Sequence, residues 1–165
     1  MQKSNKILIA YFSYSGNTGI VAQEIKKVIG GDVFKIETVE EYPQNYNRVV
    51  DIARQEQKAD ARPALKTSIV DMDSYNVIIL GYPNWCGTIP MAVFTFLERY
   101  NFKDKIILPY CTHGGSRMGR SETDIVKAAR GADVKRGLDI YGSDVKNSKT
   151  AISGWLKREG IIQQV

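Results

Sequence analysis

The chain has 165 residues, the size of one domain, and that length buries a core without help from disulfides or a metal. Hydrophobic residues make up 43% and charged residues 25%, which excludes a disordered chain, and no apolar run approaches the roughly 20 residues of a membrane span. The net charge of +5 is scattered instead of clustered with aromatic side chains, which excludes a typical nucleic-acid-binding protein. We expect one cytoplasmic domain over residues 1–165, with no metal site and no nucleic acid partner.

Short apolar runs, typical of buried parallel strands, alternate with helical patterns along the chain. In the first half, strands are predicted at 7–12 and 33–36, with helices from Thr18 to Gly30-Gly31 and from Tyr46 to just before Arg62-Pro63. In the second half, strands are predicted at 77–80, 106–108 and 134–141, with helices after Pro90, across 125–129 and across 152–156. This alternation predicts an α/β protein with a doubly wound, five-stranded parallel sheet and helices on both faces.

In sheets of this kind ligands bind beyond the carboxyl ends of the strands, which directs attention to three loops. The first loop, Ser13-Tyr14-Ser15-Gly16-Asn17-Thr18, runs directly into a helix. Its hydroxyls, its glycine and the free amides of the helix N-terminus are groups that bind an anion. A ligand-free helix cap needs only one such side chain, so we favour a terminal phosphate ester. The absence of a lysine and of a G-x-G-x-x-G pattern argues against a Walker A loop and against a dinucleotide.

The other two loops contain an aromatic side chain and several glycines. The second loop runs from Pro83 through Asn84, Trp85, Cys86 and Gly87 to Thr88 and Pro90, and Trp85 offers a flat face unless it simply packs over the sheet edge. We expect Gly87 to adopt a positive φ or to bring its amide close to a ring. The third loop, Thr112-His113-Gly114-Gly115-Ser116, brings further amides to the same edge. Together the three loops indicate a mononucleotide that carries a planar heterocycle.

These loops resemble those of the flavodoxin-like family of FMN-binding proteins, in particular its short bacterial flavodoxin-type members. The match is carried by residues 13–18, 75–85 and 112–116, and it covers nearly the whole chain. The resemblance implies the sheet order 2-1-3-4-5 and an FMN that is held non-covalently. It also implies the cofactor-binding residues, which are Ser13, Tyr14, Ser15, Gly16, Asn17, Thr18, Pro83, Asn84, Trp85, Cys86, Gly87, Thr88, Thr112, His113, Gly114, Gly115 and Ser116.

Two features depart from the family pattern. The chain is basic, whereas many electron-shuttling flavodoxins are strongly acidic, and Cys86 stands where relatives often repeat an aromatic residue. A signalling receiver domain shares the same winding, but it needs acidic residues after its first and third strands. This chain has Tyr11-Phe12-Ser13 and Tyr82-Pro83-Asn84 at those places, which excludes that class.

Three functions stay open at this point. In the first, FMN carries single electrons between redox partner proteins. In the second, FMN takes hydride from NAD(P)H and passes it to a quinone or a similar small acceptor, and the cationic Arg117 and Arg120 beside the third loop suit anionic NAD(P)H or an acidic protein partner. The third is a binding module without redox turnover. No side chain is predicted to be catalytic, because the flavin carries the chemistry. The electron donor, the acceptor and the oligomeric state stay open.

Four single residues carry expectations of their own. His113, the one histidine, is read as a flavin-edge or substrate-facing residue, with a plain surface histidine as the alternative. Cys86 and Cys111 are expected to be two small buried side chains instead of a redox pair. Trp155 belongs to a helical apolar stripe and is expected in the core.

Overall fold

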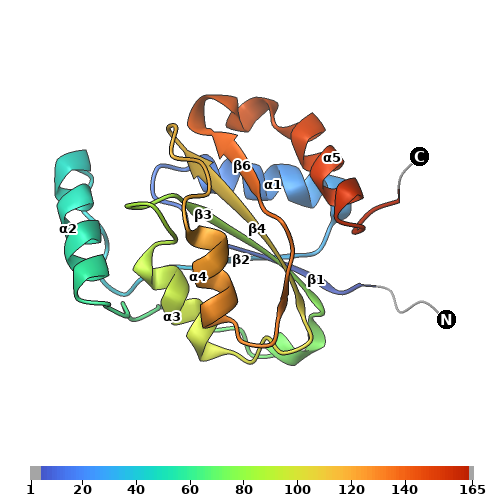
Figure 1. The fold of residues 1–165 in the computed structure, drawn as a ribbon, viewed down its shortest axis with the longest axis horizontal. Coiled ribbons are helices and arrows are strands. Elements are labelled where there is room, and N and C mark those ends of the chain that lie inside the picture. Colours follow the sequence, from blue (N-terminus) through green and yellow to red (C-terminus); the bar gives the residue numbers. More distant parts are fainter. Residues whose placement is uncertain (1–4, 164–165) are drawn as a thin grey trace.

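The computed structural model describes residues 5–163 and contains a six-stranded parallel sheet (Figure 1). The strands are β1 (Ile7–Tyr11), β2 (Asp32–Lys35), β3 (Val77–Pro83), β4 (Ile106–His113), β5 (Asp133–Val134) and β6 (Leu138–Tyr141). The helices are α1 (Asn17–Ile29), α2 (Tyr46–Lys58), α3 (Met91–Arg99), α4 (Ser121–Ala128) and α5 (Lys149–Arg158), with short 3-10 helices at Met72–Ser74 and Gly142–Asn147. The sheet order is β2-β1-β3-β4-β5, with β6 also paired to β4, which confirms the predicted doubly wound order.

The edge of the sheet next to β4 differs from the prediction, because the strand expected at 134–141 is divided into β5 and β6. β5 pairs with Ile106 and Ile107, and β6 begins its pairing at Tyr110. Pro109 lies in the gap and has no N–H to donate to a neighbouring strand. The carbonyl of Arg136 in the same gap accepts a 2.9 Å hydrogen bond from the Trp155 indole instead. The interruption therefore leaves no unpaired carbonyl at that position.

Strands β3 and β4 both extend further than predicted. β3 reaches Pro83 and β4 reaches His113, whereas the apolar runs predicted their ends at Leu80 and Leu108. The last residues of β4 are buried although Thr112 and His113 are polar, so hydropathy concealed the end of the strand. Two residues assigned to the third loop therefore lie on the last rungs of the sheet.

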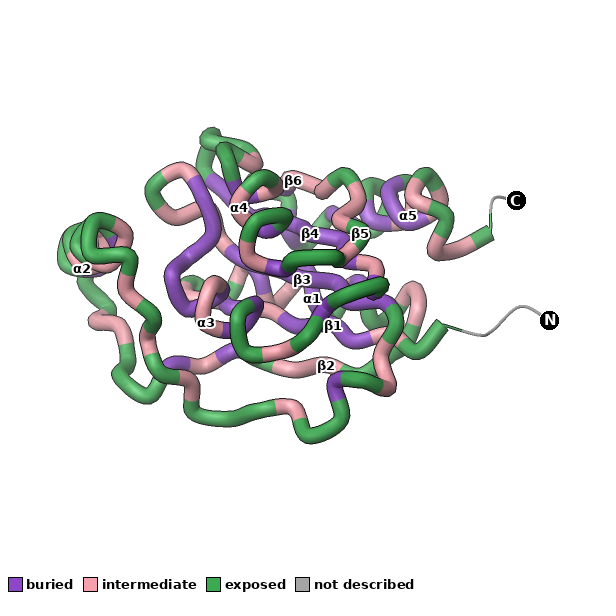
Figure 2. Tube along the Cα trace, turned by 60° about the horizontal axis from the view of Figure 1, so that its bottom comes forward, coloured by how far each residue is buried: buried purple, intermediate pink, exposed green. Residues whose placement is uncertain are grey.

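Alternate side chains of the central strands fill two separate cores. Ile78 and Leu80 point into the core beneath α3 and α4, whereas Val77 and Ile79 point into the core beneath α1 and α5. The tube of Figure 2 is accordingly purple along the central strands. Trp155 is 1% exposed within the α1–α5 core, which confirms its prediction. No helix within residues 5–163 has the length and apolarity to cross a membrane.

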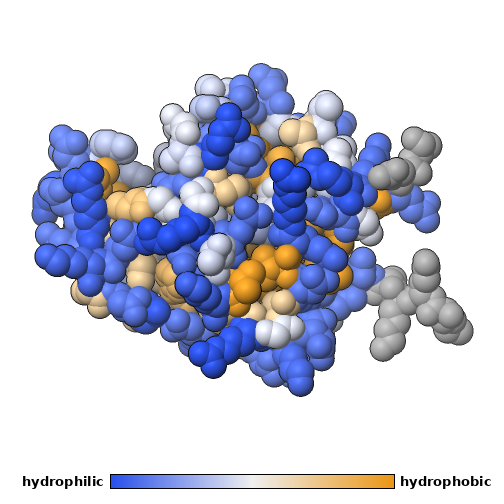
Figure 3. Space-filling view, in the orientation of Figure 1, coloured by the Kyte–Doolittle hydropathy of each residue, from blue (hydrophilic) through white to orange (hydrophobic). Residues whose placement is uncertain are grey.

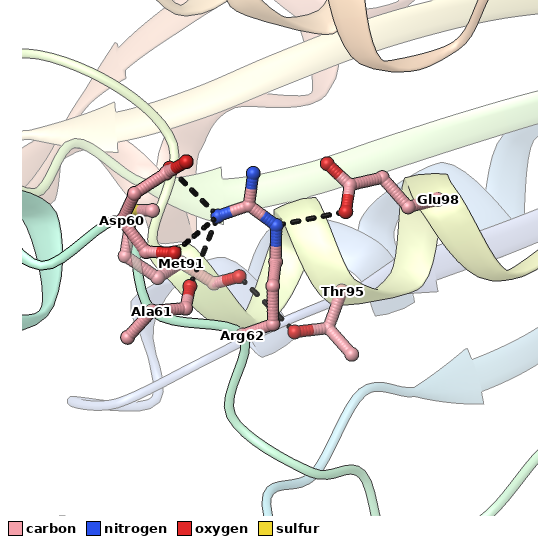
Figure 4. Close-up of polar contacts among 6 residues, drawn as sticks. All are labelled: Asp60, Ala61, Arg62, Met91, Thr95 and Glu98. Atoms are coloured by element: carbon pink, nitrogen blue, oxygen red, sulfur yellow. Dashed lines mark hydrogen bonds and ion pairs between the residues drawn. The ribbon is translucent and has the colours of Figure 1, made fainter.

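Helix α2 lies apart from the sheet, at the left of Figure 1, and its outer surface is largely hydrophilic in Figure 3. The segment that follows it is fastened to α3 by Arg62 (Figure 4). The Arg62 guanidinium lies 2.8 Å from carboxylate oxygens of both Asp60 and Glu98, and its carbon lies 4.9 Å from the centre of the Phe94 ring. These contacts fix the end of α2 at which the chain returns toward the sheet.

Candidate functional site

A cavity of about 700 Å³ lies at the carboxyl ends of β1, β3 and β4. Residues of all three predicted loops line it. The predicted site residues that line the cavity are Tyr14, Ser15, Asn17, Pro83, Asn84, Trp85, Cys86, Thr112, His113 and Gly114. The predicted site residues that lie outside its lining are Ser13, Gly16, Thr18, Gly87, Thr88, Gly115 and Ser116.

The first loop forms a tight turn at the N-terminus of α1. Gly16 has a φ of +99°, a conformation that favours glycine. The Ser13 hydroxyl accepts from the amides of Gly16 and Gly19 at 3.2 and 3.3 Å, and the Ser15 hydroxyl accepts from the Asn17 amide at 3.5 Å. These distances lie at or beyond the upper end of the usual N–H···O range, so the amides at the start of α1 are candidate donors to an anion.

Thr18 braces this loop against the sheet. Its side chain is buried, and its hydroxyl lies 2.8 Å from the hydroxyl of Thr112 on β4. The Tyr110 hydroxyl donates to the Thr18 carbonyl at 2.9 Å. The hydroxyl predicted as a phosphate ligand is therefore engaged with β4, and Thr112 joins the first and third predicted loops.

The second and third loops are tied together by the Asn84 side chain. Its amide nitrogen donates to the Arg117 carbonyl at 2.8 Å, and its oxygen accepts from the Gly87 amide at 2.9 Å. Gly87 has the expected positive φ, +89°, but its N–H is used inside the loop. The Thr88 hydroxyl is buried and donates to Asp124. These groups support the cavity wall from behind.

Trp85 is both part of the cavity wall and the centre of an aromatic cluster. Its ring meets those of Phe12, Tyr42 and Tyr14 edge to face, with centroids 5.2, 5.0 and 6.0 Å apart. The Tyr14 hydroxyl donates to the Pro43 carbonyl at 2.6 Å, which draws the segment after β2 against the cluster. Trp85 therefore packs over the sheet edge and also lines the cavity, and its stacking on a ligand stays a prediction. The part of Tyr42 was not predicted, because it lies in a segment with no regular pattern.

His113 is held in one orientation at the end of β4. Its side chain is fully buried, which rules out the surface-histidine alternative. The Gly115 amide donates to Nδ1 at 2.9 Å, so the neutral ring carries its proton on Nε2 and donates it to Asp139, 2.9 Å away. The Tyr141 ring lies 4.5 Å from the imidazole, centre to centre. Both ring nitrogens are thus occupied by the protein.

The cations expected beside the third loop have acidic partners. Arg117 lies 3.7 Å from a carboxylate oxygen of Asp139, and Arg120 lies 3.3 Å from one of Asp124. These carboxylates belong to β6 and α4, which lie outside the three predicted loops. The third loop is therefore closer to electrically balanced than its own residues indicate.

The two cysteines differ in their surroundings. Cys111 is buried, and that burial raises the pKa of its thiol to about 12. Cys86 is exposed and has a φ of +54°, so the expectation that both are buried is wrong for Cys86. The reason is the tight turn between Trp85 and Gly87, which directs this residue away from the core. Both thiols are free.

Two parts of the cavity wall were not predicted from the sequence. One is helix α2, which contributes Tyr46, Val49, Val50, Ala53 and Arg54, and the other is the segment Tyr141 to Ser143 after β6. The periodicity of α2 predicted a helix, but it did not indicate that the apolar face of this helix lines the cavity. Arg54 is the one charged side chain that lines the cavity within residues 5–163.

A parallel sheet of order 2-1-3-4-5, with a glycine-containing turn from β1 into α1 and two further loops around one cavity, defines a flavodoxin-like α/β protein. The sequence pattern of the flavodoxin family matches residues 6–159. The chain belongs to the flavodoxin family, as the sequence predicted. No curated protein matches it.

Solved structures extend this comparison. The chain is 30% identical to a protein from Bacteroides eggerthii DSM 20697 that is classed as a flavoprotein, with a TM-score of 0.83 over 93% of this chain and 97% of that one. A similarly classed protein from Bacteroides uniformis ATCC 8492 is 25% identical, with a TM-score of 0.82 over 94% of this chain and 99% of that one. A flavoprotein from Lactobacillus acidophilus NCFM, crystallised in complex with FMN, shares the fold at 23% identity, with a TM-score of 0.71 over 87% of this chain and 97% of that one.

Proposed function

We propose that this protein holds FMN non-covalently in the cavity and transfers electrons through it. The observation that carries the proposal is a single cavity that joins the turn at the start of α1 to a wall containing the Trp85 indole. Membership of the flavodoxin family supports FMN as the cofactor. The FMN complex of the Lactobacillus acidophilus flavoprotein supports it as well. When bound, FMN supplies a ring that accepts and returns electrons.

The proposal assigns each part of the cavity a task. The turn at 13–18 holds the phosphate through backbone amides at the N-terminus of α1 and through the Ser15 hydroxyl. Pro83 to Cys86 and Thr112 to Gly114 lie along the ring. Four further residues hold these loops in place through hydrogen bonds without lining the cavity, and they are Ser13, Thr18, Gly87 and Thr88. His113 is a positioning residue, since neither ring nitrogen is free to bind the cofactor.

Titrating the flavin-free protein with FMN and with riboflavin tests this assignment. The two ligands differ only in the phosphate. Two hydrogen bonds to a charged group, each worth about 1.5 kcal/mol or more, make FMN bind at least about a hundredfold more tightly. Equal dissociation constants for FMN and riboflavin, measured by flavin fluorescence, would contradict a phosphate site at this turn. FAD titrated in parallel is expected to bind more weakly than FMN.

A second candidate is NAD(P)H-dependent reduction of a quinone or a similar acceptor. The observation that favours it is the part of the cavity that extends to α2, beyond the three loops assigned to FMN, where a small acceptor has room beside the flavin. Oxidation of NADPH and NADH by the FMN-loaded protein, measured with and without a quinone, tests it. A single-electron shuttle instead oxidises neither nucleotide at an appreciable rate.

A further inference from the structure

One face of α2 borders the cavity along most of the length of the helix. Tyr46, Val49, Val50, Ala53 and Arg54 line the cavity, and they follow the i, i+3, i+4, i+7, i+8 spacing of a single helical face. At 1.5 Å per residue this face extends about 12 Å. Val49 and Ala53 are buried, yet neither belongs to the two cores of the sheet. The apolar stripe of α2 is thus used to build the cavity.

Helix α2 is held in this place by polar contacts near its C-terminal end. Glu56 accepts from the Tyr42 hydroxyl at 2.6 and 2.9 Å, and the Gln57 side chain donates to the Cys86 carbonyl at 3.2 Å. Arg62 fastens the following segment to Glu98 on α3. At the other end of the face, Tyr46 is 74% exposed at the entrance of the cavity. The wall is therefore anchored at one end and open at the other.

The wall formed by α2 carries a single positive charge. Arg54 is the charged side chain of the cavity lining, and within residues 5–163 it forms no ion pair. No carboxylate lines the cavity in the same range. A guanidinium beside an apolar stripe suits a small planar molecule with one anionic group. A nicotinamide dinucleotide, with two or more phosphates and an adenosine, exceeds what a single cation and a wall of about 12 Å provide.

We propose that this face of α2 is the subsite for a small, planar, anionic quinone-type acceptor, beside the loops assigned to the flavin ring. This inference rests on the proposed function, since it requires bound FMN. The acceptor packs on Tyr46 and Val50 and directs its anionic group to Arg54. It gains two electrons and one proton from the reduced flavin anion and a second proton from water. It leaves as a hydroquinone, and the flavin is left oxidised.

The first experiment measures binding without turnover, on oxidised FMN-loaded protein. The probe is naphthalene-2-sulfonate, and the neutral comparison is naphthalene-2-carboxamide. Changes in flavin absorbance report the dissociation constants. Arg54→Gln is expected to weaken the sulfonate about two- to fivefold, the range for an exposed ion pair, and to leave the carboxamide unchanged. High salt is expected to reduce this difference, because exposed charges are screened.

Arg48→Gln is the matched control. Arg48 is an exposed arginine of the same helix that lies outside the cavity lining, so its loss removes the same charge without touching the subsite. Equal losses of sulfonate affinity in both variants would overturn the proposal, because the effect would then be one of net charge. Tyr46→Ala is expected to weaken both probes alike. Unchanged binding of both probes in that variant would also overturn the packing that we propose.

FMN titrations of the same variants separate this inference from the proposed function. Arg54→Gln and Arg48→Gln are both expected to bind FMN as the unaltered protein does. If Arg54→Gln alone loses FMN affinity, the wall belongs to the flavin site and the subsite is refuted, whereas the proposed function stands. If the unaltered protein binds no FMN, the proposed function fails before any probe is added. Reoxidation of photoreduced protein by 1,4-naphthoquinone-2-sulfonate and by 1,4-naphthoquinone then tests turnover, and Arg54→Gln is expected to slow only the former.

Discussion

Helices α1 and α2 have the same length, 13 residues, and both show an apolar face in the sequence, yet these faces contact different parts of the molecule. Helix α1 packs Val21, Ala22 and Ile25 completely against the sheet. Helix α2 buries only Val49 and Ala53 and turns its apolar face to the cavity. The comparison teaches that periodicity identifies the face of a helix that is covered, but it does not identify what covers it.

The largest difference between the two helices is expected in stability. Ile25→Ala in α1 removes a fully buried side chain from a core, at a cost of about 2–5 kcal/mol. Ile52→Ala in α2 is the matched change at a partly exposed position and is expected to cost less than about 1 kcal/mol. Urea unfolding of the two variants measures both values. Similar costs would contradict the view that α2 lies outside the cores.

A second prediction concerns the glycines at the two ends of α1. Gly16 and Gly30 both have a positive φ, and a Cβ at either would meet no atom within 4 Å. Alanine at either position is therefore expected to cost about 1–2 kcal/mol of stability through backbone strain. Only Gly16→Ala is also expected to weaken FMN, by tenfold or more, because Gly16 shapes the anion-binding turn. A fluorescence titration in which both variants bind FMN equally would argue against that turn.

A smaller effect separates the two tryptophans. Trp85 lies against α2, whereas Trp155 lies in the core beneath α1. Stacking on the flavin is worth about 0.5–1.5 kcal/mol, so Trp85→Ala is expected to lower FMN affinity about two- to twelvefold. Bound FMN is expected to quench the fluorescence of Trp85 and to quench that of Trp155 much less. If the quenching survives in Trp85→Ala, the stacking assignment is wrong.

The smallest prediction is a pH effect confined to α2. Burial raises the pKa of the Glu56 carboxyl, an effect that the hydrogen bond from Tyr42 opposes. A carboxyl whose pKa is raised by folding loses stabilisation as the pH rises through that pKa. Glu56→Gln does not titrate, so its stability relative to the unaltered protein is expected to increase between about pH 4 and pH 7. Thermal melts across this range measure the difference.

Glu24→Gln in α1 is the control for that effect. Glu24 forms an exposed pair with Lys27 at 3.0 Å, and such pairs contribute little to stability. A pH dependence of the same size in both variants would show that general charge balance, and not the burial of Glu56, causes it.

The features that sequence analysis predicted correctly depend on short stretches of chain. The turn at 13–18 needs only a strand, a glycine and a helix start in succession, and its place at the sheet edge follows from the winding. The position of Trp85 at the same edge of the sheet was predicted for the same reason. What was missed depends on residues that are distant in sequence. Asp139 reaches His113 across adjacent strands, and Tyr42 reaches Trp85 from an irregular segment.

The expectation for Cys86 was wrong because hydropathy describes a residue type, not the turn in which it lies. The division of the last predicted strand was missed because it depends on Pro109 of a neighbouring strand. Neither effect can be recognised from the residues in the segment itself.

The hydrogen bonds around Asn84 have a mechanical consequence. Its backbone amide donates to the Thr112 carbonyl at 2.9 Å, and its side chain bonds both Gly87 and Arg117. The amide of Arg120 also donates to the Gly87 carbonyl at 2.9 Å. The second and third loops, which are separated by more than twenty residues of sequence, are therefore linked into one unit by hydrogen bonds. Moving either loop alone would break these hydrogen bonds, so we expect a ligand to enter past the first loop or the N-terminal end of α2, with the second and third loops as the stationary side of the entrance.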